Sequence, residues 1–327
     1  MKEWNSPVVV GYDTSRESEF ALKWAAEVAQ RRAVSLIVVH ATSVEHPAVE
    51  MARAGILEMY QQRAQEIAEQ GAAQARTLAS IQVTAAGVQS GAAAALVDYS
   101  RRASLVVVGH RGRSLLSGAL LGSDAAAVAT HAACPVAVIR QSPRPLPSMQ
   151  HPVVVGVDGS EHSTRALDEA ALLAEDTGSF LRVVVAWRPP EKHLWSGLFA
   201  QRQAPPAGAH ADKAAPVALP GAEAFPQAWR SADEQAGLYD QLASDVAERA
   251  AETARWATER VHARHPDLKV EQVVSEGRAA QAIVAAAADA SMIAVGARGH
   301  GDLKTLLLGS VSRKVMQRAE CAVYVIR

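Results

Sequence analysis

Short apolar runs alternate with longer segments of helical periodicity along both halves of the chain. In the first half the apolar runs begin at positions 8, 36, 81, 105 and 135, and Ala-rich or amphipathic segments separate them. Most of these runs are apolar at successive positions, which is typical of strands buried on both faces of a parallel sheet. The alternation predicts an α/β fold with helices on both faces of the sheet.

The same order of segments occurs twice. Residues 8–18 read VVVGYDTSRES and residues 153–163 read VVVGVDGSEHS, at an offset of 145 residues. Further on, residues 106–123 (VVVGHRGRSLLSGALLGS) match residues 293–310 (IAVGARGHGDLKTLLLGS) at an offset of 187. Such self-similarity indicates two copies of one structural unit. We therefore predict two tandem doubly wound α/β domains.

A proline-rich segment separates the two copies. It places the first domain at residues 1–143, a linker at residues 144–152 and the second domain at residues 153–327. The second copy is 42 residues longer, and most of the excess forms a Pro/Ala/Gly-rich insertion at residues 189–231. This composition fits an irregular surface loop, and a partly ordered lid is the alternative.

Composition and charge restrict the class of protein. The formal net charge is -1, which gives no electrostatic footprint for nucleic acid or for an anionic membrane. The apolar runs are too short or too interrupted for membrane insertion, and the first residues lack a signal-peptide pattern. Two cysteines in 327 residues exclude a disulfide framework. We expect a cytoplasmic protein that binds neither nucleic acid nor membrane.

Candidate binding chemistry follows the first and fourth strands of each copy. Ligands bind beyond the carboxyl ends of strands in sheets of this kind. The first strand ends in Gly-x-Asp, and the fourth ends in a Gly-x2-Gly-x9-Gly-Ser pattern with an arginine inside it, called the glycine motif below. The residues are Gly11, Asp13, Gly109, Arg111, Gly112, Gly122 and Ser123 in the first copy and Gly156, Asp158, Gly296, Arg298, Gly299, Gly309 and Ser310 in the second.

The glycine motif predicts a phosphate site. Glycines let the backbone approach a ligand closely, a helix that begins at Ser offers unpaired N–H groups, and arginine binds phosphate oxygens. The two aspartates could accept hydrogen bonds from a ribose or a base, or help to hold Mg²⁺. The alternative is that the glycines serve only the turns of an α/β fold.

Together these motifs resemble the universal stress protein family, in the form of a tandem two-domain member of its ATP-binding branch. The resemblance implies that each domain is a five-stranded parallel sheet that pairs through its last strand. It places adenine near Asp13 and the Ala41 backbone, or near Asp158 and Ala186. It places the phosphates at the glycine motif and, in the second copy, at Val311 as well.

The expected function is that of an ATP-binding stress-response regulator with one nucleotide site in each lobe and with Mg²⁺ accompanying the ATP. Signalling would pass through a regulatory protein partner or through self-association as a homodimer. Fast catalysis is not expected, because no general base lies beside a metal cluster in the sequence pattern. The alternatives are a slow ATPase or nucleotidyl-transfer enzyme, and a nucleotide-free interaction scaffold.

The two copies differ at positions next to these motifs. Asp124 follows Ser123 where Val311 follows Ser310, and a carboxylate there suits a helix N-terminus but repels a triphosphate. The Tyr12 ring could crowd an adenine or stack on it. Cys134 and Cys321 directly precede the last strands. We expect them to be buried as small hydrophobic residues rather than to act as redox sensors. Ser15 and Ser160 are interpreted as helix N-caps rather than nucleophiles.

Overall fold

The computed structural model describes residues 6–43, 53–112, 121–140, 146–189, 232–299 and 308–327. The elements of the first lobe are β1 (Val8–Gly11), α1 (Arg16–Arg31), β2 (Leu36–Thr42), α2 (Arg53–Leu78), β3 (Val83–Gln89), α3 (Ala92–Tyr99), a 3-10 turn (Ser100–Arg102), β4 (Leu105–Gly109), α4 (Ser123–His131) and β5 (Val136–Ile139). Those of the second lobe are β6 (Val153–Gly156), α5 (Glu161–Asp176), β7 (Leu181–Trp187), α7 (Ala232–His262), β8 (Val270–Glu276), α8 (Ala279–Ala286), β9 (Met292–Gly296), α9 (Ser310–Arg318) and β10 (Ala322–Ile326).

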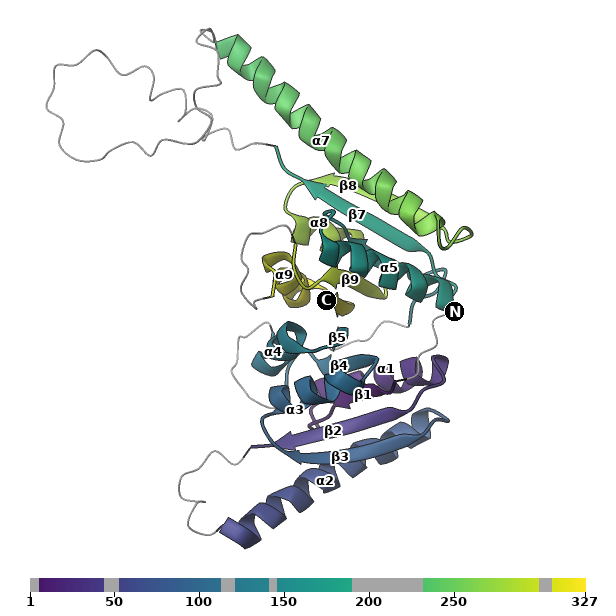
Figure 1. Ribbon diagram of the computed structural model, residues 1–327, viewed down its shortest axis with the longest axis vertical. Coiled ribbons are helices and arrows are strands. Elements are labelled where there is room, and N and C mark those ends of the chain that lie inside the picture. The colour runs from purple at the N-terminus through teal and green to yellow at the C-terminus, as the bar shows by residue number, and fades with distance from the viewer. Residues whose placement is uncertain (1–5, 44–52, 113–120, 141–145, 190–231, 300–307) are drawn as a thin grey trace, which may run out of the picture.

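The ten strands of the described residues form one sheet in the order β3-β2-β1-β4-β5-β10-β9-β6-β7-β8. Strand pairing is parallel within each lobe, and the sequence-based prediction of an α/β fold with two doubly wound repeats is confirmed. Figure 1 shows the two lobes above and below their junction, with the long helices α2 and α7 at opposite ends of the sheet. The third strand of the first lobe begins at Val83 rather than at the predicted residue 81, because its pairing with β2 begins there, opposite Leu36, and it extends to the polar Gln89.

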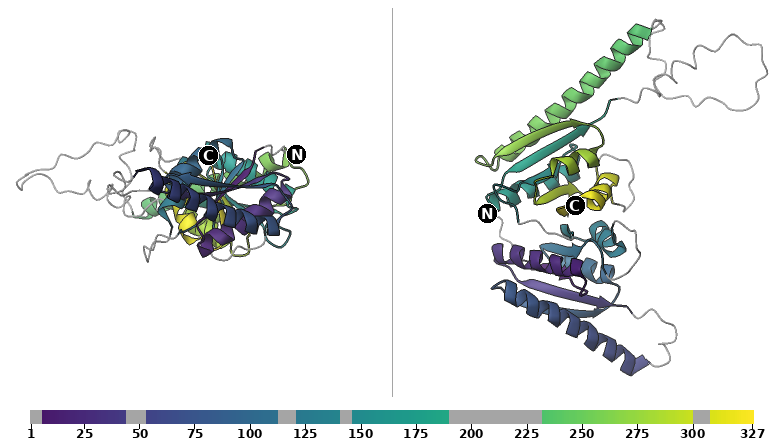
Figure 2. Two further views of the ribbon diagram at one scale, coloured as in Figure 1. Left: turned by 90° about the horizontal axis from the view of Figure 1, so that it is seen from below. Right: turned by 180° about the vertical axis from the view of Figure 1, so that it is seen from behind.

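Helices cover both faces of this sheet, as Figure 2 shows from below and from behind. Side chains of α1, α2, α5 and α7 pack on one face, and side chains of α3, α4, α8 and α9 pack on the other. Each of these two layers of core includes residues from both lobes. The valines of β1 and β6 are fully buried, which explains why these runs have no polar position.

The lobes join through their last strands, which run antiparallel. Val138 pairs with Val323, and Ala137 pairs with Tyr324, whose side chain is among the largest that are fully buried. The sequence left open whether these strand edges pair within one chain or between chains. In this structure they pair within the chain, so each covers the other's open edge.

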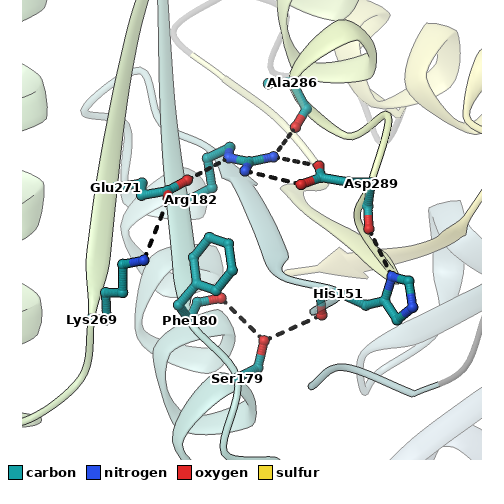
Figure 3. Close-up of polar contacts among 8 residues, drawn as sticks. All are labelled: His151, Ser179, Phe180, Arg182, Lys269, Glu271, Ala286 and Asp289. Atoms are coloured by element: carbon teal, nitrogen blue, oxygen red, sulfur yellow. Dashed lines mark hydrogen bonds and ion pairs between the residues drawn. The ribbon is translucent and has the colours of Figure 1, made fainter. Parts of the chain in front are cut away.

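A polar cluster lies at the amino ends of the second lobe's strands, at the end of the sheet opposite the predicted site. Arg182 of β7 donates to Glu271 of β8 at 2.9 Å, and its guanidinium also bonds the carbonyl of Ala286, the last residue of α8, and the carboxylate of Asp289 beyond it (Figure 3). Hydrogen bonding with Asp289 is the largest cause that raises the pKa of Arg182. The His151 ring contacts the Asp289 carbonyl at 3.1 Å. This cluster ties two strands to a helix at the end of the sheet away from the predicted site, and its role is structural.

The insertion predicted at residues 189–231 lies, apart from Pro189, outside the described residues. The long helix α7 begins directly after it, at Ala232. Within the described ranges, no helix combines the length and the apolar character needed to cross a membrane.

Candidate functional site

A cleft opens at the carboxyl ends of β1, β2 and β4 in the first lobe. Its empty space amounts to about 630 Å³, open side included. All eight first-lobe residues predicted from the sequence line it: Gly11, Asp13, Ala41, Gly109, Arg111, Gly112, Gly122 and Ser123. The structure therefore brings the Gly-x-Asp motif and the glycine motif to one place.

Several lining residues were not part of the predicted site. Val39, Ala92 and Leu96 add an apolar wall, and His40 and Asp124 add polar groups. The start of α3 directly after Gly91 was the available signal for Leu96, because it places that helix over the ends of the first two strands. An apolar wall facing a polar rim suits a ligand with a flat ring at one end and charge at the other.

A short hydrogen-bonded turn fixes the aspartate after β1. Asp13 Oδ1 accepts from the Ser15 backbone N–H at 3.0 Å and from Ser15 Oγ at 2.5 Å. Ser15 Oγ in turn accepts from the Ser18 N–H at the start of α1, which makes Ser15 the N-cap as predicted. Thr14 has a φ of 66°, in the left-handed region that non-glycine residues rarely adopt. The carboxylate is thus held in one orientation before any ligand arrives.

The second lobe repeats this turn bond for bond. Asp158 Oδ1 accepts from the Ser160 N–H at 3.0 Å and from Ser160 Oγ at 2.6 Å, and Ser160 caps α5. Gly159, with a φ of 81°, occupies the position equivalent to Thr14. Glycine adopts this left-handed backbone conformation at lower cost than threonine does.

The glycine motif lies directly on this aspartate. A Cβ atom added to Gly112 would lie 2.9 Å from Asp13 Oδ2, and one added to Gly299 would overlap Asp158 Oδ2 still more. Any larger residue at either position would displace the carboxylate. The glycine therefore allows the close approach of the two motifs, which is a role at the site and not only in a turn.

The two described ends of the glycine motif meet through a backbone hydrogen bond. The Gly122 N–H donates to the His110 carbonyl at 2.7 Å, and the Gly309 N–H donates to the Ala297 carbonyl at 2.8 Å. Gly122 and Gly309 are the N-cap residues of α4 and α9 and have no side chain to cap these helices. In contrast to α1 and α5, the first turns of α4 and α9 thus receive no hydrogen bond from an N-cap side chain, which favours an anion there.

The first glycine of each motif has a structural role. A Cβ at Gly109 would lie 2.9 Å from the Glu17 carbonyl carbon, and one at Gly296 would lie 2.7 Å from that of His162. These positions need glycine so that α1 and α5 can pack against the ends of β4 and β9. For Gly109 and Gly296 the purely structural interpretation of the glycines is sufficient.

Arg111 brings a cation to the cleft. Its side chain is half-buried, and within the described part of the chain its Nε atom is buried without a hydrogen-bond partner. A buried, unsatisfied N–H is costly, and an oxygen anion is the ligand that satisfies it best. Arg298 occupies the same place in the second lobe and is also half-buried.

The remaining second-lobe residues occupy positions equivalent to those of the first. Ala186 lies near the end of β7, and Gly156 ends β6 against Ile283 of α8. Ser310 begins α9, and Val311 follows it, half-buried against the core on that face. The hydrogen bonds of the aspartate turn and the close contacts of the glycines therefore recur in the second lobe.

The structure shows where the Tyr12 ring lies. Its side chain is only 3% exposed, and a Cβ added to Gly71 of α2 would lie 2.7 Å from Tyr12 Cδ1. Burial is the main cause that raises its pKa. The ring thus packs into the core against α2, although Tyr12 also lines the cleft, and this packing fixes the direction of the ring. The Tyr12 carbonyl accepts a hydrogen bond from His40 Nδ1 at 2.7 Å, which fixes the His40 ring at the cleft.

Neither the cysteines nor a protein-built metal centre supplies chemistry in the described residues. Within those ranges no group of three or more His, Cys, Asp or Glu side chains is placed to hold a metal ion. Cys321 is buried, and burial raises the pKa of the Cys134 thiol to about 12. Both cysteines are packed as small hydrophobes, as the sequence favoured.

We expect Cys134 to be almost unreactive in the native protein. A thiol with a pKa of about 12 holds little thiolate at pH 8, so alkylation in a Cys321→Ala background should be slower than for a free cysteine by roughly a thousandfold. Iodoacetamide labelling followed by mass spectrometry measures this rate, and urea-unfolded protein is the control that must label rapidly. Rapid labelling of the folded protein would contradict the packing described.

The chain has clear relatives among known proteins. The model of the universal stress protein family matches residues 5–140 and 149–327. Universal stress protein Rv1996 of Mycobacterium tuberculosis is 32% identical over 343 residues, covering 100% of this chain and 96% of the relative. Universal stress protein Rv2005c of the same organism is 32% identical over 330 residues, covering 98% and 96%.

A solved structure shows the same fold. The crystal structure of a universal stress protein from Archaeoglobus fulgidus matches over 98% of both chains, with a TM-score of 0.63 and 19% sequence identity. The predicted membership of the universal stress protein family is confirmed by the sequence comparisons, and the predicted fold by the solved structure. The chain belongs to the universal stress protein family, as a member with two tandem domains.

Proposed function

We propose that each lobe binds one ATP molecule and that the protein is a nucleotide-dependent stress-response regulator. The observation that carries the proposal is the meeting of three features in one cleft. These are the fixed Asp13 carboxylate, the half-buried Arg111, and the start of α4 behind a glycine N-cap. A purine nucleotide has the flat ring, the sugar hydroxyls and the anionic tail that these features would bind.

The proposed roles follow the layout of the cleft. The adenine would lie against the apolar wall near the Ala41 backbone and within reach of Asp13. The phosphates would lie at Arg111, Gly112 and the N-terminus of α4, with Gly109 and Gly122 shaping the backbone around them. In the second lobe the same roles fall to Ala186, Asp158, Arg298, Gly299, Ser310 and Val311, with Gly156, Gly296 and Gly309 shaping the backbone. Gly11 and Ser123 complete the first site.

Mg²⁺ would enter with the nucleotide and not before it. Because the described residues include no cluster of three ligands, the phosphate oxygens would have to supply most of the coordination. When bound, the ion would neutralise part of the phosphate charge. In the first lobe it would also weaken repulsion between the phosphates and Asp124 at the start of α4.

The regulatory part of the proposal concerns surfaces rather than chemistry. A bound nucleotide would fix the ends of the glycine motif. A regulatory protein partner or a second copy of the chain would then recognise the surface that the fixed motif forms. Because β5 and β10 already pair with each other, a homodimer would need a surface other than these strand edges. The cytoplasm remains the expected compartment.

The proposal is tested by thermal unfolding of nucleotide-free protein with and without Mg-ATP. At an ATP concentration of 100 times Kd, each occupied site should stabilise the fold by about 2.7 kcal/mol, so the unfolding temperature should rise. MgCl₂ with sodium phosphate is the control. An unchanged unfolding temperature at millimolar Mg-ATP, together with no binding heat, would favour the nucleotide-free scaffold.

Turnover separates a regulator from an enzyme. We expect phosphate release from Mg-ATP at well below roughly 1 per second, the lower end of ordinary enzyme rates. A continuous phosphate assay on the intact chain measures this. A rate at or above that value, lost on Arg111→Ala with Arg298→Ala, would replace the regulator with an ATPase.

A further inference from the structure

Two arginines cross the junction between the lobes in equivalent ways. Arg140 follows β5 and donates from Nη1 to the Ala319 carbonyl at 2.7 Å and from Nη2 to the Gln317 carbonyl at 2.8 Å. Arg327 follows β10 and donates from Nη1 to the Ala132 carbonyl at 3.2 Å. The antiparallel pairing of β5 with β10 delivers each side chain to the other lobe.

The carbonyls that these arginines bind are at the carboxyl ends of α9 and α4. Ala319 is the C-cap of α9, and Ala132 is the C-cap of α4. These are the two helices whose amino ends begin at Ser310 and Ser123, inside the predicted sites. A cation at a helix C-terminus binds orphan carbonyls and complements the helix dipole. Each arginine therefore holds one end of a helix whose other end belongs to the opposite lobe's site.

Each arginine also lies beside the arginine of its own lobe's glycine motif. The His110 N–H donates to the Ile139 carbonyl at 2.8 Å, which brings Arg111 and Arg140 close in space. Burial, and after it the like charge of Arg111, lowers the pKa of Arg140, while Glu320 acts in the opposite direction.

The second lobe repeats this arrangement. The Ala297 N–H donates to the Ile326 carbonyl at 2.6 Å, next to Arg298 and Arg327. Burial and the like charge of Arg298 lower the pKa of Arg327. In both lobes the arginine of the site thus repels the arginine that crosses the junction.

This repulsion gives the two sites a physical connection. A phosphate bound at Arg111 would neutralise that charge and relieve the repulsion on Arg140. Arg140 would then bind the end of α9 more strongly, and α9 would be held more firmly for a phosphate at its N-terminus. The same sequence of effects runs from Arg298 through Arg327 to α4.

We propose that Arg140 and Arg327 are positioning residues that couple the two sites, so that an anionic ligand in one lobe raises the affinity of the other. This inference rests on the proposed nucleotide function and adds a regulatory property to it. Arg140 makes two bonds to α9 while Arg327 makes one to α4, so the Arg140 route carries more of the coupling.

The test measures ATP binding to the second site alone in the full-length chain. Asp13→Ala with Gly112→Ala removes the first site, and isothermal titration with Mg-ATP gives Kd for the remaining one. Adding Arg140→Gln releases the carboxyl end of α9 and should weaken that Kd by about fivefold. Arg140→Lys, which keeps the cation, should recover part of the loss. Arg101→Gln, a change of an exposed arginine, should have no effect.

Titration of the chain with both sites intact provides a readout that a purely structural role would not change. We expect positive cooperativity in the wild-type protein, weaker cooperativity in Arg140→Gln, and independent binding in the Arg140→Gln, Arg327→Gln double variant. Circular dichroism confirms that each variant is folded, and if Arg140→Gln is not, Arg327→Gln measured at the first site gives the reciprocal test.

The possible failures are distinguishable. If wild-type protein binds ATP without cooperativity, or if Arg140→Gln gives the same second-site Kd as Arg101→Gln, the coupling is overturned while the nucleotide function remains. If the wild-type protein binds no ATP, the nucleotide function is overturned and the coupling falls with it.

Discussion

Replacing Asp158 and Gly299 together with alanine is expected to abolish ATP binding in the second lobe and to leave the first lobe occupied. The double change removes the carboxylate that would accept from the ligand and adds a methyl group to the glycine of the motif that is proposed to lie against the phosphates. A lost hydrogen bond to a charged group costs about 1.5–3 kcal/mol, and the added bulk increases that loss. Weakening of the second site by about 100-fold or more is expected.

Titration calorimetry measures the number of ATP molecules bound per chain, which should fall from two to one. The matched control is Asp13→Ala with Gly112→Ala, which should remove the other site. The fold should persist, because Gly299 is exposed and its φ lies outside the left-handed region. If both double variants still bind two ATP, the assignment of the sites is wrong.

Truncating Tyr324 to alanine is expected to destabilise the whole chain and not only the second lobe. Tyr324 is fully buried in β10, opposite Ala137 of β5, and the core layer around it includes residues of both lobes. Removing a large buried aromatic side chain costs about 3–5 kcal/mol of unfolding free energy. The two lobes should still unfold in one transition, because they share this core.

Urea unfolding followed by circular dichroism measures the effect. Tyr324→Phe keeps the ring and should lose much less stability, and Tyr60→Ala, at an exposed position of α2, should lie within about 0.5 kcal/mol of wild type. A loss of under about 1 kcal/mol in Tyr324→Ala, or two separate transitions in the wild-type protein, would show that the junction contributes little.

Much of the fold and of the site follows from local sequence patterns. Apolar runs such as residues 8–10 and 153–155, alternating with helical segments, predicted strands buried on both faces, and the structure confirms this. The glycine motif and the Gly-x-Asp motif converge because parallel strands bring their carboxyl ends to one edge of the sheet. The N-caps at Ser15 and Ser160 were likewise predictable from the sequence, since capping depends on neighbours within the same turn.

Features that depend on distant contacts could not be predicted in this way. The direction of the Tyr12 ring is set by Gly71 on α2, which no local pattern links to β1. Arg140 appears in the sequence as an ordinary cation after a strand, and its two bonds to α9 exist only because β5 pairs with β10.

The amount of nucleotide carried by freshly purified protein tests the central claim most directly. The protein is denatured, the supernatant is separated by ion-exchange chromatography, and released nucleotide is quantified per chain, with Mg-ATP added back to a second sample before washing. The account predicts close to two ATP per chain in the reloaded sample, and about one in the Asp158→Ala, Gly299→Ala variant. No nucleotide in either wild-type sample, with no thermal shift on adding Mg-ATP, would contradict it and leave a scaffold whose glycines only shape the fold.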